Sequence, residues 1–194
     1  PVALNYEDVD LVSIDFEKIN ELSIVGNESS RRLGVLKSLL FSMEYYVLEN
    51  TFNLYIIDDV NRQLKDFKEK MYTEEYTLDY SRIGEIIIDL EEKFEERYNS
   101  LLQNEGGEKI RMPLQIVVIN SKEAIEYISS NKQILERYNK LVKQYKALGI
   151  SFIYSNIEDV NVPYGAPEIL KRQKENKKVL ITTSKLKDFK FCEL

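Results

Sequence analysis

A glycine between a short apolar run and a helix-like run is the first place where residue types and spacing suggest chemistry. Residues 22–25 read LSIV, a strand-like stretch, and Gly26 follows them directly. A phosphate-binding loop has this layout, with the template G-x-x-x-x-G-K-[ST]. Its glycines admit backbone amides to the phosphates, its lysine reaches the β- and γ-phosphates, and its hydroxyl binds Mg²⁺. The eight residues from Gly26 are therefore the candidate nucleotide site.

Only the first glycine of that template is retained. Arg31 replaces the second glycine, and Arg32 replaces the lysine with a wider, planar head. The hydroxyl becomes Leu33, which cannot ligate a metal, and Glu28 adds a carboxylate where a phosphate would sit. The candidate loop residues are Gly26, Asn27, Glu28, Ser29, Ser30, Arg31, Arg32 and Leu33.

The charges of this loop predict how it is held without a nucleotide. Cations in the first turn of a helix oppose the helix dipole, so we expect Arg31 and Arg32 to point away or to pair with a carboxylate such as Glu28. The sequence thus predicts a loop closed by its own side chains. Taken alone, the stretch also fits a plain strand–loop–helix corner, whose helix is capped by Asn27, Ser29 or Ser30.

Two further strand ends are candidates for the acid and base of ATP hydrolysis. Residues 55–59 read YIIDD, but they form the first strand after the loop's helix. RecA-like ATPases place another strand between the loop and the metal-associated acid, which assigns that acid to the end of residues 114–119. There the sequence has Asn120 and Ser121. Asparagine is a poorer Mg²⁺ partner than a carboxylate, and serine cannot act as the general base.

Composition narrows the classes of function. The chain has 194 residues, 43% of them hydrophobic, which is enough for one core, and we expect a single domain over residues 1–194. It has no histidine, which excludes catalysis by histidine and metal sites with histidine ligands. Its single cysteine, Cys192, fits a reducing compartment. No apolar stretch is long enough to span a bilayer. We expect a soluble piece, and the first residue, Pro1, suggests a segment of a longer protein.

Charge is unevenly distributed along the chain. Residues 85–97 are rich in acids, whereas residues 131–149 and 171–178 are rich in lysine and arginine. The simplest interpretation is that these are solvated helix faces; the basic segments are also candidates for a contact surface. A net charge of −6 and an isoelectric point near 5.0 argue against tight nucleic-acid binding.

Apolar periodicity predicts alternating strands and helices. Strand candidates are residues 12–16, 22–25, 54–58, 114–119, 150–154 and 178–183, most of them short apolar runs without polar alternation, as is typical of buried parallel strands. Apolar residues at helical spacing lie between them, at residues 33–47, 83–101 and 134–148. The longest loop is expected at residues 103–113. The alternation favours an α/β fold with a mainly parallel central sheet flanked by helices.

Nearly the whole chain is covered by five segments in a fixed order: LSIVGNESS, LYIIDD, IIIDLEEKFEERYNSLLQ, MPLQIVVIN and LVKQYKALGISFIYSN. In order and spacing they resemble the FtsK/SpoIIIE family of RecA-like motor ATPases, which implies the RecA-like P-loop NTPase fold. The resemblance places a sensor-like residue at Asn156. It matches an E-x-x-x-R-Y type segment of the family to Glu92, Glu95, Glu96, Arg97 and Tyr98.

Loss of all the catalytic positions at once resembles a C-terminal ATPase domain of the membrane-bound coupling protein of Gram-positive type VII secretion. This resemblance implies a pseudo-ATPase at the cytoplasmic side of the membrane, acting in substrate recognition or regulation. Its implied partners are secreted WXG100-like proteins and neighbouring ATPase domains. The full-length protein is a possible homo-oligomer. The resemblance implies no nucleic-acid binding, and membrane contact only through the parent protein. No catalytic residue, metal or cofactor is expected. We expect ATP or Mg²⁺ to bind at most weakly. The alternatives are an active or weakly nucleotide-binding motor domain and a purely architectural oligomerisation domain.

Overall fold

The centre of the protein is a six-stranded parallel sheet with the strand order β5-β4-β6-β7-β3-β8. A computed structural model describes residues 3–4, 11–12, 14–16, 18–44, 52–103, 112–157, 167–176 and 178–182. The strands are β3 (Glu21–Val25), β4 (Phe52–Ile57), β5 (Thr73–Thr77), β6 (Leu114–Ile119), β7 (Ile150–Ile157) and β8 (Val179–Ile181). The helices are α1 (Ser29–Glu44), α2 (Arg82–Gln103), α3 (Lys122–Ser130), α4 (Lys132–Lys143) and α5 (Glu168–Asn176), with short 3₁₀ turns η1 (Lys65–Phe67) and η2 (Lys146–Leu148).

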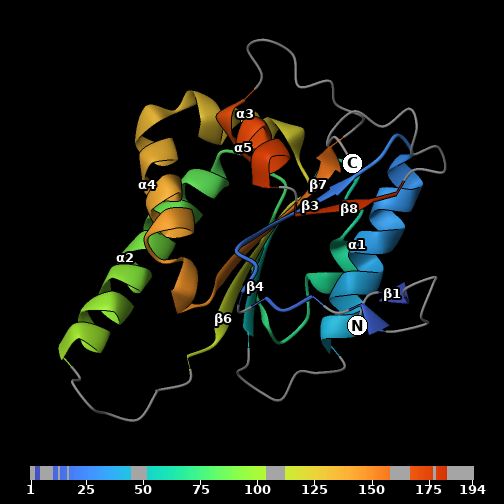
Figure 1. Cartoon of the computed structure of the whole chain (residues 1–194). Coiled ribbons are helices and arrows are strands. Elements are labelled where there is room, and N and C mark those ends of the chain that lie inside the picture. The colour runs from blue at the N-terminus through green and yellow to red at the C-terminus, as the bar shows by residue number, and fades with distance from the viewer. Residues whose placement is uncertain are drawn as a thin grey trace.

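Helices cover both faces of this sheet, with α1 on one side and α2 to α5 on the other (Figure 1). Side chains of a strand alternate between the faces, as β6 shows. Ile116 and Val118 belong to the core under α1, whereas Val117 and Ile119 belong to the core under α2 to α5. Because both faces are covered, most positions of such a strand favour an apolar residue, which explains the short apolar runs in the sequence.

The predicted strands at residues 22–25, 54–58, 114–119 and 150–154 are confirmed as β3, β4, β6 and β7. The predicted strand at 178–183 is present as the shorter β8, and residue 183 lies outside the described residues. Most of the loop predicted at 103–113 also lies outside them, as do Cys192 and the end of the helix predicted at 33–47. The apolar stripe at 134–148 is split between α4 and η2.

The strand predicted at residues 12–16 is wrong. Of the residues described there, only β2 (Leu11–Val12) is a strand, and it pairs antiparallel with β1 (Ala3–Leu4) in a separate two-stranded sheet. The chain then turns, because the carbonyl of Asp15 accepts hydrogen bonds from the amides of Lys18 and Ile19, both at 3.0 Å. Ile14 and Phe16 are apolar because they pack against the α1-side core from this turn.

The acid-rich helix α2 packs against the basic helix α4, so part of the uneven charge is neutralised internally. Glu91 of α2 is 7% exposed, and it accepts hydrogen bonds from Arg137 and, at 2.8 Å, from the Nζ of Lys140. Lys140 also lies 3.6 Å from a carboxylate oxygen of Glu95. Burial raises the pKa of Glu91, but the hydrogen bonds from Lys140 and Arg137 outweigh this and hold it below its usual value.

We therefore expect Glu91→Gln to lower the free energy of unfolding at neutral pH by about 1–2 kcal/mol. A depressed folded-state pKa contributes stability above the unfolded pKa of about 4.3, and this contribution is lost as pH falls through the folded value. Urea unfolding at neutral and acid pH should show the difference from the wild type shrinking in acid. Glu92→Gln, on an exposed position of the same helix, is the control and should change little. An equal loss in both variants would contradict the prediction.

Candidate functional site

The candidate loop lies at the carboxyl edge of the sheet, where ligands bind in open parallel α/β sheets. Gly26 follows β3, Asn120 follows β6, and β7 runs between these two strands. β7, which contains the sensor-like Asn156, thus lies between β3, which leads into the loop, and β6, which leads to the acid position at Asn120. Asn156 lies in β7, but its side chain is outside what the structure describes.

Arg32, at the position of the template lysine, turns inward. Its side chain is 2% exposed, and its Nη1 donates a hydrogen bond to the carbonyl of Gly26. Thr182, just after β8, lies against the same glycine: its amide and its hydroxyl donate to the carbonyl of Val25 at 2.9 and 3.1 Å. The cation that a working loop would offer to phosphate here binds the loop's own backbone.

Arg31 pairs with Glu28, as the helix dipole predicts. The Nε of Arg31 lies 2.8 Å from a carboxylate oxygen of Glu28, and both side chains are about half exposed. Asn27, Ser29 and Ser30 are exposed, and the two serines are the first residues of α1. Leu33 packs against the α1-side core, so the position of the metal-binding hydroxyl serves the core.

Asn120 and Ser121 are both buried, and each has a structural partner. The Nδ2 of Asn120 donates to the Oδ1 of Asp58 at 2.9 Å. Ser121 caps α3: its hydroxyl accepts from the amide of Ala124 at 3.2 Å and donates to Glu123 at 2.9 Å. Both residues thus stabilise the end of β6 and the start of the next helix.

The structure brings together Asp58 and Asn120, a pairing that sequence reasoning missed. Asp58 is 1% exposed and directly follows β4, the strand beside β6. It accepts further hydrogen bonds from the amides of Leu64 and Asp59, at 2.7 and 2.9 Å, and from the hydroxyl of Tyr76 at 2.8 Å. Burial and the bond to Asp58 raise the pKa of Tyr76 well above its usual value. The carboxylate is thus enclosed by protein donors, and among the described residues no three acidic or cysteine side chains form a metal-binding group.

We expect Asp58→Ala to lower the free energy of unfolding by about 3 kcal/mol, because it leaves buried donors without an acceptor. If Asp58 held magnesium instead, the wild type alone would be stabilised by the ion. Urea unfolding with and without magnesium chloride should therefore give the same difference between wild type and variant. Asp89→Ala, at an exposed position of α2, is the control and should change stability by less than about 0.5 kcal/mol. A loss for Asp58→Ala as small as the control's would contradict the structural role.

Comparison with known proteins gives structural relatives but no sequence relatives. No protein-family model and no curated protein matches the chain. The structure of EccC (ATPases 2 and 3) from Thermomonospora curvata, solved with a signal sequence peptide, matches with a TM-score of 0.71 and 16% identity over 93% of this chain and 33% of that one. The cytoplasmic domain of EssC matches with a TM-score of 0.70 and 18% identity, over 95% of this chain and 36% of that one.

A conjugation coupling protein, TcpA of pCW3, solved with ATPγS, is a more distant match, with a TM-score of 0.55 and 16% identity over 74% of this chain and 44% of that one. The chain spans about a third of the length of the EccC and EssC chains. Among the described residues, no helix has the length and apolar character to cross a bilayer. The predicted α/β class with a parallel central sheet is confirmed, and the chain shares its fold with EssC and with the type VII secretion ATPase EccC of Thermomonospora curvata.

Proposed function

We propose that this chain is a degenerate ATPase domain of a type VII secretion coupling protein, and that it acts in recognition or regulation without hydrolysing ATP. The observation that carries the proposal is the inward turn of Arg32 onto the carbonyl of Gly26. In a nucleotide-bound loop, a cation at this position neutralises phosphate charge. Here it already has a buried acceptor, and nucleotide binding would have to break that contact.

The other catalytic positions support the same proposal. Phosphoryl transfer depends on a phosphate cradle, a metal ligand, an acid and a water-positioning group acting together. Leu33 contributes to the core, Asn120 binds Asp58, and Ser121 caps a helix. Each substituted residue therefore stabilises the fold, and reversal of any one of them alone would not restore hydrolysis.

For the parent protein, we propose an EssC of the staphylococcal kind, with this chain as its last ATPase-like domain at the cytoplasmic side of the membrane. Its partners would be secreted WXG100-like substrates and the neighbouring ATPase domains, and it would need no bound nucleotide. The support is the order of the sequence segments and the fold shared with EccC and EssC. One of those structures, the EccC of Thermomonospora curvata, contains a signal sequence peptide, and that peptide motivates the proposed substrate contact.

Turnover of ATP by the purified chain tests the loss of catalysis. We expect phosphate release no faster than in buffer, and no change with Arg32→Ala. Arg31→Ala, which removes an exposed arginine one position earlier, is the matched control. Turnover by the wild type that disappears in Arg32→Ala but persists in Arg31→Ala would overturn the proposal.

Titration with candidate secreted proteins tests the recognition role. We favour an apolar contact, for which affinity depends on one or two buried anchors and changes little between low and high salt. A mainly electrostatic contact would weaken with salt, because exposed charges are screened over about 10 Å at 0.1 M. Lack of binding at high micromolar concentration, both alone and with the adjoining ATPase domain attached, would leave only an architectural role.

A further inference from the structure

The two basic segments of the sequence meet around a pocket at the amino edge of the sheet, the edge opposite the Gly26 loop. The pocket has a volume of about 560 Å³. Its lining includes Glu21, the first residue of β3, and Lys178, directly before β8. Val142 of α4 and Lys146 of η2 also line it. Pockets of about 300–1,000 Å³ have the size of small-molecule sites.

Cations outnumber acids in this lining. Five of the nine lining residues are basic, namely Lys18, Lys143, Lys146, Arg172 and Lys178, and one is acidic, Glu21. Arg172 neutralises Glu21 through bonds of 2.9 and 3.2 Å, and Lys18 lies 2.8 Å from a carboxylate oxygen of Asp15. The other three lysines form no ion pair with a carboxylate in the described part of the chain. They give the pocket a net positive charge.

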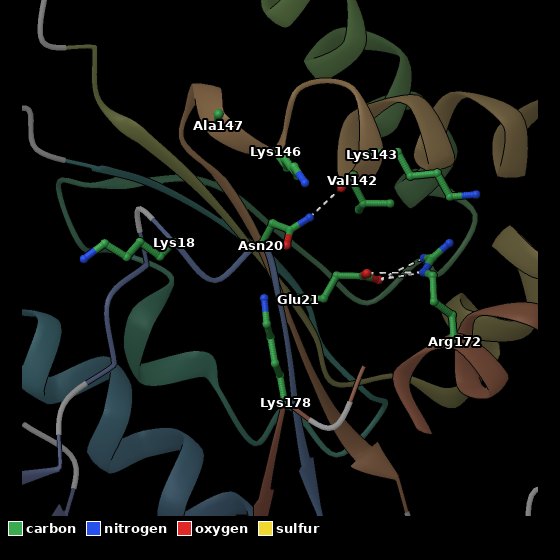
Figure 2. A pocket seen from close by; sticks show the side chains of 9 residues that line it. All are labelled: Lys18, Asn20, Glu21, Val142, Lys143, Lys146, Ala147, Arg172 and Lys178. Carbon is green, nitrogen blue, oxygen red and sulfur yellow. Dashed lines mark hydrogen bonds and ion pairs between the residues drawn. The ribbon is translucent and has the colours of Figure 1, made fainter. Parts of the chain in front are cut away.

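Figure 2 shows how these side chains lie. The amine of Lys178 is directed toward Asn20 and Glu21, and Lys146 lies on the other side of Asn20. The amines of Lys18 and Lys143 are directed outward, and their flexible four-carbon stems allow them to turn toward a bound anion. The Nδ2 of Asn20 donates to the carbonyl of Val142 at 2.5 Å. The pocket therefore has polar side chains held in place by hydrogen bonds, Asn20 and Glu21, with flexible lysine side chains around them.

We propose that this pocket binds a compact anion with adjacent phosphate groups, such as pyrophosphate or a triphosphate group. Lysine amines bind phosphate as point charges, and cations from α4, η2 and α5 and from the segments just before β3 and β8 surround one concavity. An acidic peptide fits less well, because acidic motifs are recognised by clusters of arginines, and Arg172, the one arginine that lines the pocket, is already paired with Glu21. Other peptides bind through buried apolar anchors. The only apolar lining residues are Val142 and Ala147, and none of the large exposed apolar side chains of the described residues lines the pocket. This site goes beyond the proposed function and is independent of the Gly26 loop.

Calorimetric titration of the whole chain with sodium tripolyphosphate, without magnesium, tests the proposal. We expect saturable binding at one site that weakens as salt rises from about 50 to about 300 mM, because the contacts are charged. Lys146→Glu/Lys178→Glu should weaken it by about tenfold or more. Lys68→Glu/Lys132→Glu makes the same change in net charge at exposed positions outside the pocket and should weaken it far less. Lys146→Gln/Lys178→Gln is a milder second variant in case charge reversal impairs folding.

Amide chemical shifts locate the bound anion. The proposal expects changes at Asn20, Glu21, Lys146 and Lys178, and none at Gly26. Absence of saturable binding, an equal loss in both charge-reversed variants, or shifts confined to the Gly26 loop would overturn it. Binding of a glutamate-rich peptide at the pocket without binding of tripolyphosphate would also overturn it, in favour of an acidic protein partner.

Discussion

Arg172→Ala is expected to lower the free energy of unfolding by about 3–5 kcal/mol, because it leaves a buried carboxylate without its cation. Glu21, at the start of β3, is 4% exposed. The guanidinium of Arg172 binds both of its oxygens, donates to Asn139, and stacks 4.8 Å above the ring of Tyr138 (Figure 2 shows the pair with Glu21). Alanine removes all of these contacts, while the hydroxyl of Tyr138 still donates to Glu21.

Urea unfolding of three variants separates this effect from a general loss of helix stability. Lys171→Ala changes the exposed neighbour in the same helix and should cost less than about 0.5 kcal/mol. Adding Glu21→Gln to Arg172→Ala removes the stranded charge, so the double variant should be more stable than the single one. A cost below about 1 kcal/mol for Arg172→Ala, or no recovery in the double variant, would contradict the buried pair as the cause.

Gly26→Ala should lower the free energy of unfolding by about 2–4 kcal/mol, because the loop is closed too tightly for a β-carbon. A β-carbon at Gly26 would lie 2.2 Å from the hydroxyl oxygen of Thr182 and 3.3 Å from its carbonyl carbon. The backbone φ of Gly26 is 155°, a conformation that residues with side chains rarely adopt. Adding Thr182→Ala removes the hydroxyl clash but not the backbone contact, so it should recover part of the loss.

Gly34 provides a control of opposite sign within the next helix. It is exposed in α1, and a β-carbon there would meet no atom within 4 Å. Gly34→Ala should therefore raise the free energy of unfolding by about 0.5–1 kcal/mol, as alanine does in a helix. Chemical or thermal unfolding of both variants gives the comparison. A Gly26→Ala protein as stable as the wild type would mean that the loop opens easily, contrary to the closed loop described above.

The sequence predicted the core of the fold better than its edges. Short apolar runs without polar alternation identified β4, β6 and β7, because strands covered on both faces admit few polar residues. The strand β5 reads TEEYT and, in the described part of the chain, lies at the edge of the sheet beside β4, so it carries no such run. Helix α3 was missed because it is nine residues long and follows β6 within two residues.

The candidate site was predictable only where its contacts are local. The pairing of Arg31 with Glu28 follows from three residues of spacing and a helix dipole. The contact of Asn120 with Asp58 joins residues 62 positions apart, and no local pattern indicates it. The two lysine-rich segments of the sequence indicated a basic surface. That both segments lie at the amino edge of the sheet depends on the strand order, which no local pattern indicates.

We propose that the loop from Gly26 to Leu33 does not hold a nucleotide. The most direct measurement is a titration of the ¹⁵N-labelled chain with Mg-ATP, followed at the amides of those residues and at the amino-edge pocket separately. A loop that does not hold a nucleotide should show no change at micromolar Mg-ATP and at most a non-saturating change at millimolar concentrations. Saturation of the loop amides at micromolar Mg-ATP, lost in Arg32→Ala and kept in Lys146→Gln/Lys178→Gln, would contradict it.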